Sequence, residues 1–236
     1  MGAAELATTS KPARRYRSPG REQQARRTRA RIIAAAADRF LARGYAATTM
    51  RAVAADAGVA LPTVELVFGT KARLLKAVID TAIAGDDKPV PMLAREWAAR
   101  AESRTGAAEF AAVFAQQLAE SARRAAGLTL AALEAARVDE DIAAVAAQLT
   151  AQRQVMAAWL VDGLLRRSAL REGVEPAAAV DTVWALMDPA VFCRLTGDRR
   201  WSPDRYRRWF ADAVVRLLLP DAGQRTSAAV SPGEPS

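Results

Sequence analysis

The sequence lacks histidine altogether and contains one cysteine, Cys193, among its 236 residues. The missing imidazole excludes Ser-His-Asp and Cys-His catalysis and most zinc chemistry. A single cysteine excludes an internal disulfide framework and a cysteine-based zinc site. We therefore expect neither an enzyme nor a resident cofactor or metal, and we expect Cys193 to be a buried, unreactive side chain.

Long apolar runs are also missing, although hydrophobic residues make up 51% of the chain. No run approaches the about 20 residues that cross a bilayer as a helix. The basic N-terminus lacks the continuous apolar segment of a signal peptide. With 25% charged residues, the composition is typical of a globular protein in solution. We expect a cytoplasmic protein without a membrane partner.

Positive charge is concentrated near the N-terminus of a chain whose formal net charge is +8. Residues 1–31 hold nine basic and two acidic residues, a net +7, so the rest of the chain carries about +1. A basic segment on a nearly neutral body is typical of an arm that binds a polyanion such as nucleic acid. The alternatives are a solvated tail and a compositional preference for arginine.

Apolar residues recur at helical spacing through most of the chain, and no stretch is typical of a strand. Alanine and leucine predominate, which favours helix by intrinsic propensity. We expect a helix from Arg21 to Gly44, a short second helix capped by Thr48 or Thr49, and a third opened by Pro62. Further helices are expected from Thr70 to the break at “GDDKPVP” and over residues 91–102, 107–125, 128–137, 139–168, 177–196 (kinked at Pro189) and 203–219.

A helix-turn-helix spacing lies at Ala54, Gly58 and Val64. A small residue at 54 lets two helices approach, Gly58 permits the positive φ of a tight turn, and Val64 packs the second helix on the first. This spacing alone fits any two helices joined by a tight turn. We assign Val64 and Phe68 to the core.

The longer stretch “RTRARIIAAAADRFLARGYAATTMRAVAADAGVALPTVELVFGTKARLL” resembles the N-terminal domain of the tetracycline-repressor (TetR) family. The matching parts are “F-x-x-x-G-Y” at the end of the first helix, “TT-x-R-x-V-A”, “AGV”, “TV” and “F-G-T-K”. The closing “DRRWSPDRYRRWFADAVVRLLL” also looks like the last helix of such regulators. The resemblance is specific over about residues 22–80 and looser over 175–219.

The resemblance implies an all-α fold and a mechanism. A three-helix domain places its third helix in the major groove of double-stranded DNA. Two protomers, joined through their last two long helices, read the halves of a near-palindrome. A small-molecule effector bound in the middle of the second domain moves the fourth helix and alters the separation of the two reading heads.

We therefore predict a ligand-responsive, homodimeric transcription regulator, acting as a repressor through the helix-turn-helix at about residues 49–68. The alternative is a family-like protein that acts through protein contacts because its recognition helix no longer reads DNA. The expected parts are a disordered basic arm (1–20), a helix-turn-helix DNA-binding domain (21–70), a helical ligand-binding and dimerisation domain (71–219) and a disordered tail (220–236).

Carried over residue by residue, the resemblance implies two kinds of DNA contact. We expect DNA phosphates to be contacted by arginines before and within the first helix and by residues at the starts of the second and fourth helices. We expect the third helix to contact the edges of the bases. The implied contacts are Arg26, Arg29, Thr48, Thr49, Arg51, Leu61, Pro62, Thr63, Glu65, Val67 and Lys71, with Thr49 alternatively acting as a cap only.

The third helix departs from the family's pattern at three positions. Many members have Ser where Ala60 stands, Tyr where Glu65 stands, and His or Tyr where Val67 stands. Glu65 can accept a hydrogen bond from cytosine N4 while Leu61 or Val67 contacts a thymine methyl group. Alternatively, Glu65 orients Arg51 or another arginine, or it does neither.

Two further sets of residues are expected in the second domain. Aromatic, methionine and polar side chains at helical spacing can line an effector pocket, although such residues are also ordinary core. These are Phe110, Phe114, Gln117, Glu134, Met156, Trp159, Trp184 and Met187. The residues expected at the dimer interface are Val183, Trp184, Val191, Tyr206, Trp209, Phe210 and Val214. Some of them can instead belong to the protomer's own core.

Overall fold

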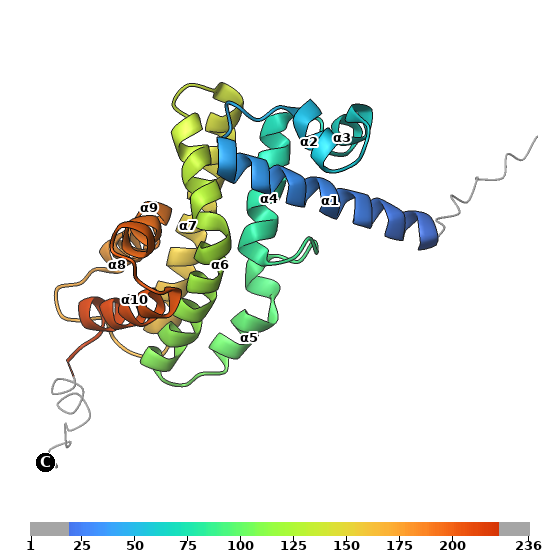
Figure 1. Ribbon diagram of the computed structural model, residues 1–236. Coiled ribbons are helices and arrows are strands. Elements are labelled where there is room, and N and C mark those ends of the chain that lie inside the picture. The colour runs from blue at the N-terminus through green and yellow to red at the C-terminus, as the bar shows by residue number, and fades with distance from the viewer. Residues whose placement is uncertain (1–18, 222–236) are drawn as a thin grey trace, which may run out of the picture.

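The computed structural model of the protein describes residues 19–221, and these form helices joined by turns and loops (Figure 1). No strand occurs among those residues, in agreement with the predicted all-α class. Parts of the predicted arm and tail, residues 1–18 and 222–236, lie outside the described residues. The elements are α1 (Pro19–Arg43), α2 (Met50–Asp56), α3 (Leu61–Phe68), α4 (Lys71–Ala84), η1 (Met92–Ala94), α5 (Glu96–Glu102), α6 (Ala107–Ala135), α7 (Glu140–Leu165), α8 (Pro176–Leu186), α9 (Pro189–Cys193), η2 (Arg194–Asp198) and α10 (Pro203–Leu218).

The first three helices follow their sequence signals. Thr49 caps α2, because its hydroxyl oxygen accepts the backbone N–H of Ala52 at 3.2 Å. Gly58 has a φ of +62° in the turn between α2 and α3, a conformation that favours glycine. Pro62 stands in the first turn of α3, where its missing N–H costs no helical hydrogen bond.

The helices predicted over residues 107–125 and 128–137 form one continuous helix, α6, which runs through Gly127. A glycine inside a helix costs about 1 kcal/mol relative to alanine. Ala126 and Leu128 on either side are 4% and 1% exposed, so their packing offsets that cost. The predicted break between these two helices is therefore wrong.

The helix predicted over residues 177–196 is interrupted rather than kinked. α8 ends at Leu186 and a new helix, α9, begins at Pro189. The Asp188 carboxylate caps α9 by accepting the backbone N–H of Ala190 at 2.8 Å. The cap and the proline together change the direction of the chain, which periodicity alone does not reveal.

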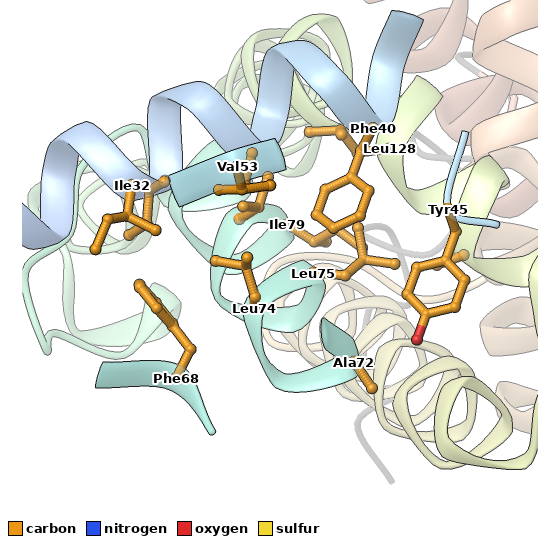
Figure 2. Packing of buried hydrophobic residues seen from close by; sticks show 14 of the residues in the cluster. Ile32, Phe40, Tyr45, Val53, Phe68, Ala72, Leu74, Leu75, Ile79 and Leu128 are labelled. Carbon is orange, nitrogen blue, oxygen red and sulfur yellow. The ribbon is translucent and has the colours of Figure 1, made fainter. Parts of the chain in front are cut away.

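One hydrophobic core joins the three-helix unit α1–α3 to the rest of the protein. Leu74 and Leu75 of α4 are both fully buried, in a cluster that also contains Ile32 and Phe40 of α1 and Leu128 of α6 (Figure 2). α4 packs against α1, α6 and α7. The three-helix unit α1–α3, called the reading unit below after its predicted role, therefore has no core separate from that of the helices that follow it.

A second core is built from aromatic side chains between α5, α6, α7 and α10. The ring centroids of Trp97 and Trp159 lie 5.4 Å apart, and those of Phe110 and Trp159 lie 5.1 Å apart. Phe110 also packs closely against α7 at residue 163. A Cβ on Gly163 would lie 2.1 Å from Cζ of the Phe110 ring, so this packing requires a glycine.

Four residues predicted at a dimer interface belong to the protomer's own core. Val183, Tyr206, Phe210 and Val214 are each 0% exposed. A side chain without accessible surface in the protomer cannot contact a second copy unless its surroundings open. The interface prediction is therefore wrong for these four. The remaining members, which are half-buried, are Trp184, Val191 and Trp209.

Replacing Gly163 by alanine is expected to destabilise the protein by about 1–3 kcal/mol, because the new methyl group overlaps the Phe110 ring. Gly127→Ala is the matched control, since its Cβ would meet only Leu41 Cδ2 at 3.4 Å. It should instead stabilise the protein by up to about 1 kcal/mol, through helix propensity. Urea unfolding followed by circular dichroism measures both. A Gly163→Ala variant as stable as the wild type would contradict the described packing.

Candidate nucleic-acid interface and ligand cavity

α3 turns one face to the core and the opposite face to solvent. Val64 and Phe68, one helical turn apart, are 0% and 6% exposed, which confirms their assignment to the core. The residues predicted to contact bases lie on the other sides of the helix. Pro62, Glu65 and Val67 are exposed, and Leu61 and Thr63 are half-buried.

Leu66 belongs to the same outer face, and the sequence reasoning missed it. Its side chain is 87% exposed. An α-helix turns by about 100° per residue, so a residue two positions from both Val64 and Phe68 points away from the core. That spacing was the available signal. Together with Val67, Leu66 makes the outer face of α3 largely apolar.

Glu65 is exposed, and its carboxylate forms no ion pair with any arginine in the described part of the chain. The alternative that it orients Arg51 or another arginine therefore has no support among the described residues. Arg51, at the start of α2, is also exposed and has no ion pair among the described residues. Both side chains are free to meet an external partner.

The two threonines before α2 have different environments. Thr48 is 1% exposed, and its hydroxyl donates a hydrogen bond to the Gly44 carbonyl at 2.8 Å. Its side chain cannot reach a phosphate, so the predicted contact is wrong for Thr48. Thr49 is exposed, and its hydroxyl oxygen is the cap of α2. Capping is thus an established role for Thr49, whether or not it also meets DNA.

Lys71 lies at the first position of α4 but folds back on the turn between α1 and α2. Its Nζ donates to the Tyr45 carbonyl at 3.1 Å and lies 4.0 Å from the centroid of the Tyr45 ring. Burial, then the charges of Asp139 and Asp141, raise the pKa of Tyr45 to about 12. Through its contacts with Tyr45, the Lys71 ammonium group links α4 to the reading unit. Two of the three N–H groups of Lys71 remain for another acceptor.

Of the two arginines predicted on α1, Arg29 has partners inside the protein. Its Nε donates to Asp87 at 2.8 Å, and its guanidinium lies 4.8 Å from the centroid of the Phe68 ring. Its charge is therefore partly compensated, and a phosphate contact of Arg29 stays a prediction. Arg26 is exposed, without an ion pair among the described residues. A separate ion pair, Arg39–Asp56, joins α1 to α2 and lowers the pKa of the Asp56 carboxyl through its hydrogen bond.

A cavity of about 1730 Å³ is lined by the first half of α1, α4, the loop that follows it, α6 and α7. This volume exceeds the roughly 300–1,000 Å³ usual for small-molecule sites. Four of the predicted pocket residues line it: Phe114, Gln117, Met156 and Met187.

The other four predicted pocket residues do not line the cavity. Phe110 is buried in the aromatic core, and Trp159 packs against it. Trp184 lies beneath the guanidinium of Arg153, 3.9 Å from its ring centroid. Glu134 is exposed on the surface of α6. Sequence periodicity placed these residues on the correct helices but could not distinguish the cavity wall from the core.

Two ion pairs line part of this cavity. Arg95 donates two hydrogen bonds to Asp86, at 3.1 and 2.9 Å, and thereby lowers the pKa of Asp86 to about 2. Lys76 pairs with Asp80 at 2.6 Å on the wall formed by α4. The lining as a whole is largely apolar, so the cavity combines a few charged groups with a hydrophobic surface, as sites for amphipathic molecules do.

α4 is the element common to the cavity and the reading unit. Leu74, Leu75 and Val78 face the core shared with α1 and α2. Ala77 and Ile83 line the cavity from the same helix. A displacement of α4 caused by a ligand would therefore act directly on the packing beneath α3.

The described residues contain neither a helix long and apolar enough to cross a membrane nor a group of side chains placed to hold a metal ion. No curated protein matches the chain. Residues 32–78 match the family of bacterial regulatory proteins called the tetR family. This match covers α2, α3, the end of α1 and the first half of α4.

Solved structures with the same fold cover both parts of the chain. NalD, the secondary repressor of a multidrug efflux pump in Pseudomonas aeruginosa, has 22% identity and a TM-score of 0.61, over 82% of this chain and 97% of that one. FadR of Bacillus subtilis, in complex with stearoyl-CoA, has 16% identity and a TM-score of 0.63, over 79% and 97%. A regulator from Saccharomonospora viridis, in complex with choline, has 16% identity and a TM-score of 0.59, over 80% and 96%.

The exposed third helix, the capped turn before it and the matched segment agree in position. At these identities the solved structures establish the fold, and the matched segment establishes the domain. The chain therefore carries the helix-turn-helix DNA-binding domain of TetR-family transcription regulators, joined to a C-terminal helical domain with the fold of those regulators.

Proposed function

We propose that this protein is a homodimeric repressor that binds a near-palindromic operator and releases it when a small molecule enters the cavity. The observation that carries the proposal is the position of α4, which contributes side chains both to the core beneath α3 and to the cavity wall. A ligand that favours one position of α4 must then change the affinity for DNA by the same coupling free energy.

Binding to DNA is assigned to the outer face of α3 and to the start of α2. Leu66 and Val67 offer apolar contacts to thymine methyl groups, and Glu65 offers an acceptor to cytosine N4. Arg51 supplies an uncompensated positive charge for a phosphate. Lys71 is assigned a secondary phosphate contact, through the N–H groups that Tyr45 does not use.

Dimerisation is assigned to the surface of α8, α9 and α10. Trp184, Val191 and Trp209 keep part of their surface accessible there, as half-buried side chains of an interface do in the free protomer. A two-fold axis through this surface would present two copies of α3 in opposite directions, which matches a near-palindromic operator.

The identity of the effector is not carried over from the related structures. Stearoyl-CoA, in the FadR complex, is an anionic amphiphile, and choline is a small cation. The cavity described here is large enough for an elongated ligand. We assign it to an effector that shifts the population of α4 positions.

Selection of bound duplexes from a random pool tests the proposal. A near-palindromic consensus, bound by two protomers in sedimentation experiments, is the expected result. An absence of enrichment would favour the alternative, a regulator that acts through protein contacts. The exposed Glu65 and Leu66 give that alternative its own basis, because an acidic and apolar helix face also suits a protein partner.

Deoxyuridine in place of thymine in the selected operator is expected to weaken binding at positions that Leu66 contacts. The substitution removes one methyl group, worth up to about 0.8 kcal/mol or about fourfold in affinity. In Leu66→Ala the two duplexes should bind equally, whereas Leu165→Ala, at another exposed leucine, should keep the difference. Fluorescence anisotropy measures each affinity. A full methyl effect in Leu66→Ala would exclude Leu66 from base contacts.

Arg51→Ala is expected to weaken DNA binding similarly for specific and scrambled duplexes, because a phosphate contact carries no sequence information. The slope of log affinity against log salt should become shallower by about 0.9. Arg100→Ala, an exposed arginine on α5, is the matched control and should leave the slope unchanged. A salt titration of DNA affinity at fixed pH measures these slopes. An unchanged slope in Arg51→Ala would rule out a phosphate contact of Arg51.

A further inference from the structure

Arg153 of α7 lines the cavity and is held on two sides by protein groups. Its Nη1 donates to Asp188 at 2.7 Å, and its guanidinium lies 3.9 Å from the centroid of the Trp184 ring. Only 13% of the side chain is accessible. The charge therefore lies in a fixed position, with limited access to water.

The hydrogen-bonding capacity of Arg153 is only partly used. A guanidinium has five N–H donors, and one nitrogen of Arg153 finds a protein acceptor. Its Nε is buried without a partner. A buried donor left without an acceptor costs about 1–3 kcal/mol. The Nε and Nη2 edge is also the edge that binds a carboxylate in bidentate geometry.

The surroundings of Arg153 favour an anion attached to an apolar body. Phe114, Met156 and Met187 line the same cavity, with Gln117 as a further polar group. The cavity lining contains eight basic and four acidic side chains in all, so its charge is positive on balance. A cationic ligand would meet an unfavourable field there, and a neutral one would leave the arginine edge unpaired.

We infer that the cavity binds an amphipathic organic acid, whose carboxylate pairs with Arg153 and whose apolar chain packs against Phe114, Met156 and Met187. The inference rests on the proposed function in taking this cavity as the effector site. Arg153 is a binding residue here, and Trp184, which was predicted in the pocket, contributes by supporting the guanidinium from behind.

Asp188 is the internal competitor for the same guanidinium. One of its carboxylate oxygens accepts the N–H of Ala190 as the cap of α9, and the other accepts from Arg153. A ligand carboxylate on Arg153 would therefore lie close to a second negative charge. Asp188→Asn keeps an oxygen for the cap but removes the charge. This substitution should strengthen binding of an acid, whereas a purely structural ion pair predicts no such gain.

Binding of three probes with the same apolar chain tests the inference: dodecanoate, 1-dodecanol and dodecylamine. The full-length protein in its native oligomeric state is titrated by calorimetry. We expect dodecanoate to bind at least about tenfold more tightly than dodecanol, a difference of about 1.4 kcal/mol, and dodecylamine to bind most weakly. Equal affinities for dodecanoate and dodecanol, or a preference for dodecylamine, would overturn the inference.

Variants separate the role of charge from the role of packing. Arg153→Met should reduce dodecanoate affinity about tenfold and leave dodecanol within about twofold, while Asp188→Asn should raise dodecanoate affinity several-fold. Arg166→Met, at an ion-paired arginine near the end of the same helix and outside the cavity, is the matched control and should change neither. An equal loss for both probes in Arg153→Met would mean that Arg153 only supports the packing.

Two further measurements keep the result decisive. If Arg153→Met does not fold by circular dichroism, Asp188→Asn decides, and unchanged or weaker dodecanoate binding overturns the inference. DNA affinity is measured separately, with dodecanoate present and absent. Dodecanoate that binds through Arg153 without changing DNA affinity would refute the effector role of the cavity but retain the acid site. Operator binding without any dodecanoate binding would refute the acid site alone.

Discussion

Leu74 and Leu75 of α4 are packed in a core that α1, α2, α6 and α7 share, and most of the molecule's arrangement depends on that packing. Apolar side chains buried at crystal-like density do not tolerate small displacements independently. The reading unit therefore cannot change its orientation without a change in α4, and α4 cannot move without altering the cavity wall. Lys71 adds a polar link at the same junction, through the carbonyl and ring of Tyr45.

Two of the basic side chains that the sequence predicts at DNA already have partners within the protein. Arg29 is compensated by Asp87, and the ammonium of Lys71 is directed to Tyr45. Both interactions join elements that lie far apart in the sequence. These contacts leave the formal net charge of +8 unchanged, since Asp87 is already counted in it, but they place an acceptor beside each cation and so weaken the local positive potential there.

Sequence reasoning predicted the helices well, because periodicity, Thr49 as a cap and Pro62 in a first turn are local signals. It failed where distant packing decides. Gly127 remains helical because its neighbours are buried. Thr48 is a local exception, since its buried hydroxyl donates to the Gly44 carbonyl only four residues earlier. In the candidate site, too, local features were predictable from the sequence and long-range contacts were not. The outer face of α3 follows from helical geometry alone, whereas the partners of Arg29 and the cavity position of Arg153 depend on segments 35 to 58 residues away in the chain.

On the proposed function, the outer face of α3 restricts how specificity can arise. A basic recognition helix would gain affinity from the phosphates of any sequence. An exposed carboxylate at Glu65 opposes such binding by about 1 kcal/mol or less in water, and an apolar Leu66 gains little from phosphates. Discrimination then arises from a difference in affinity. DNA sequences that offer methyl groups and a cytosine amine at the right positions bind more tightly than sequences that do not. A helix of this composition lowers non-specific affinity more than specific affinity, so its acidic residue serves selectivity instead of contradicting DNA binding.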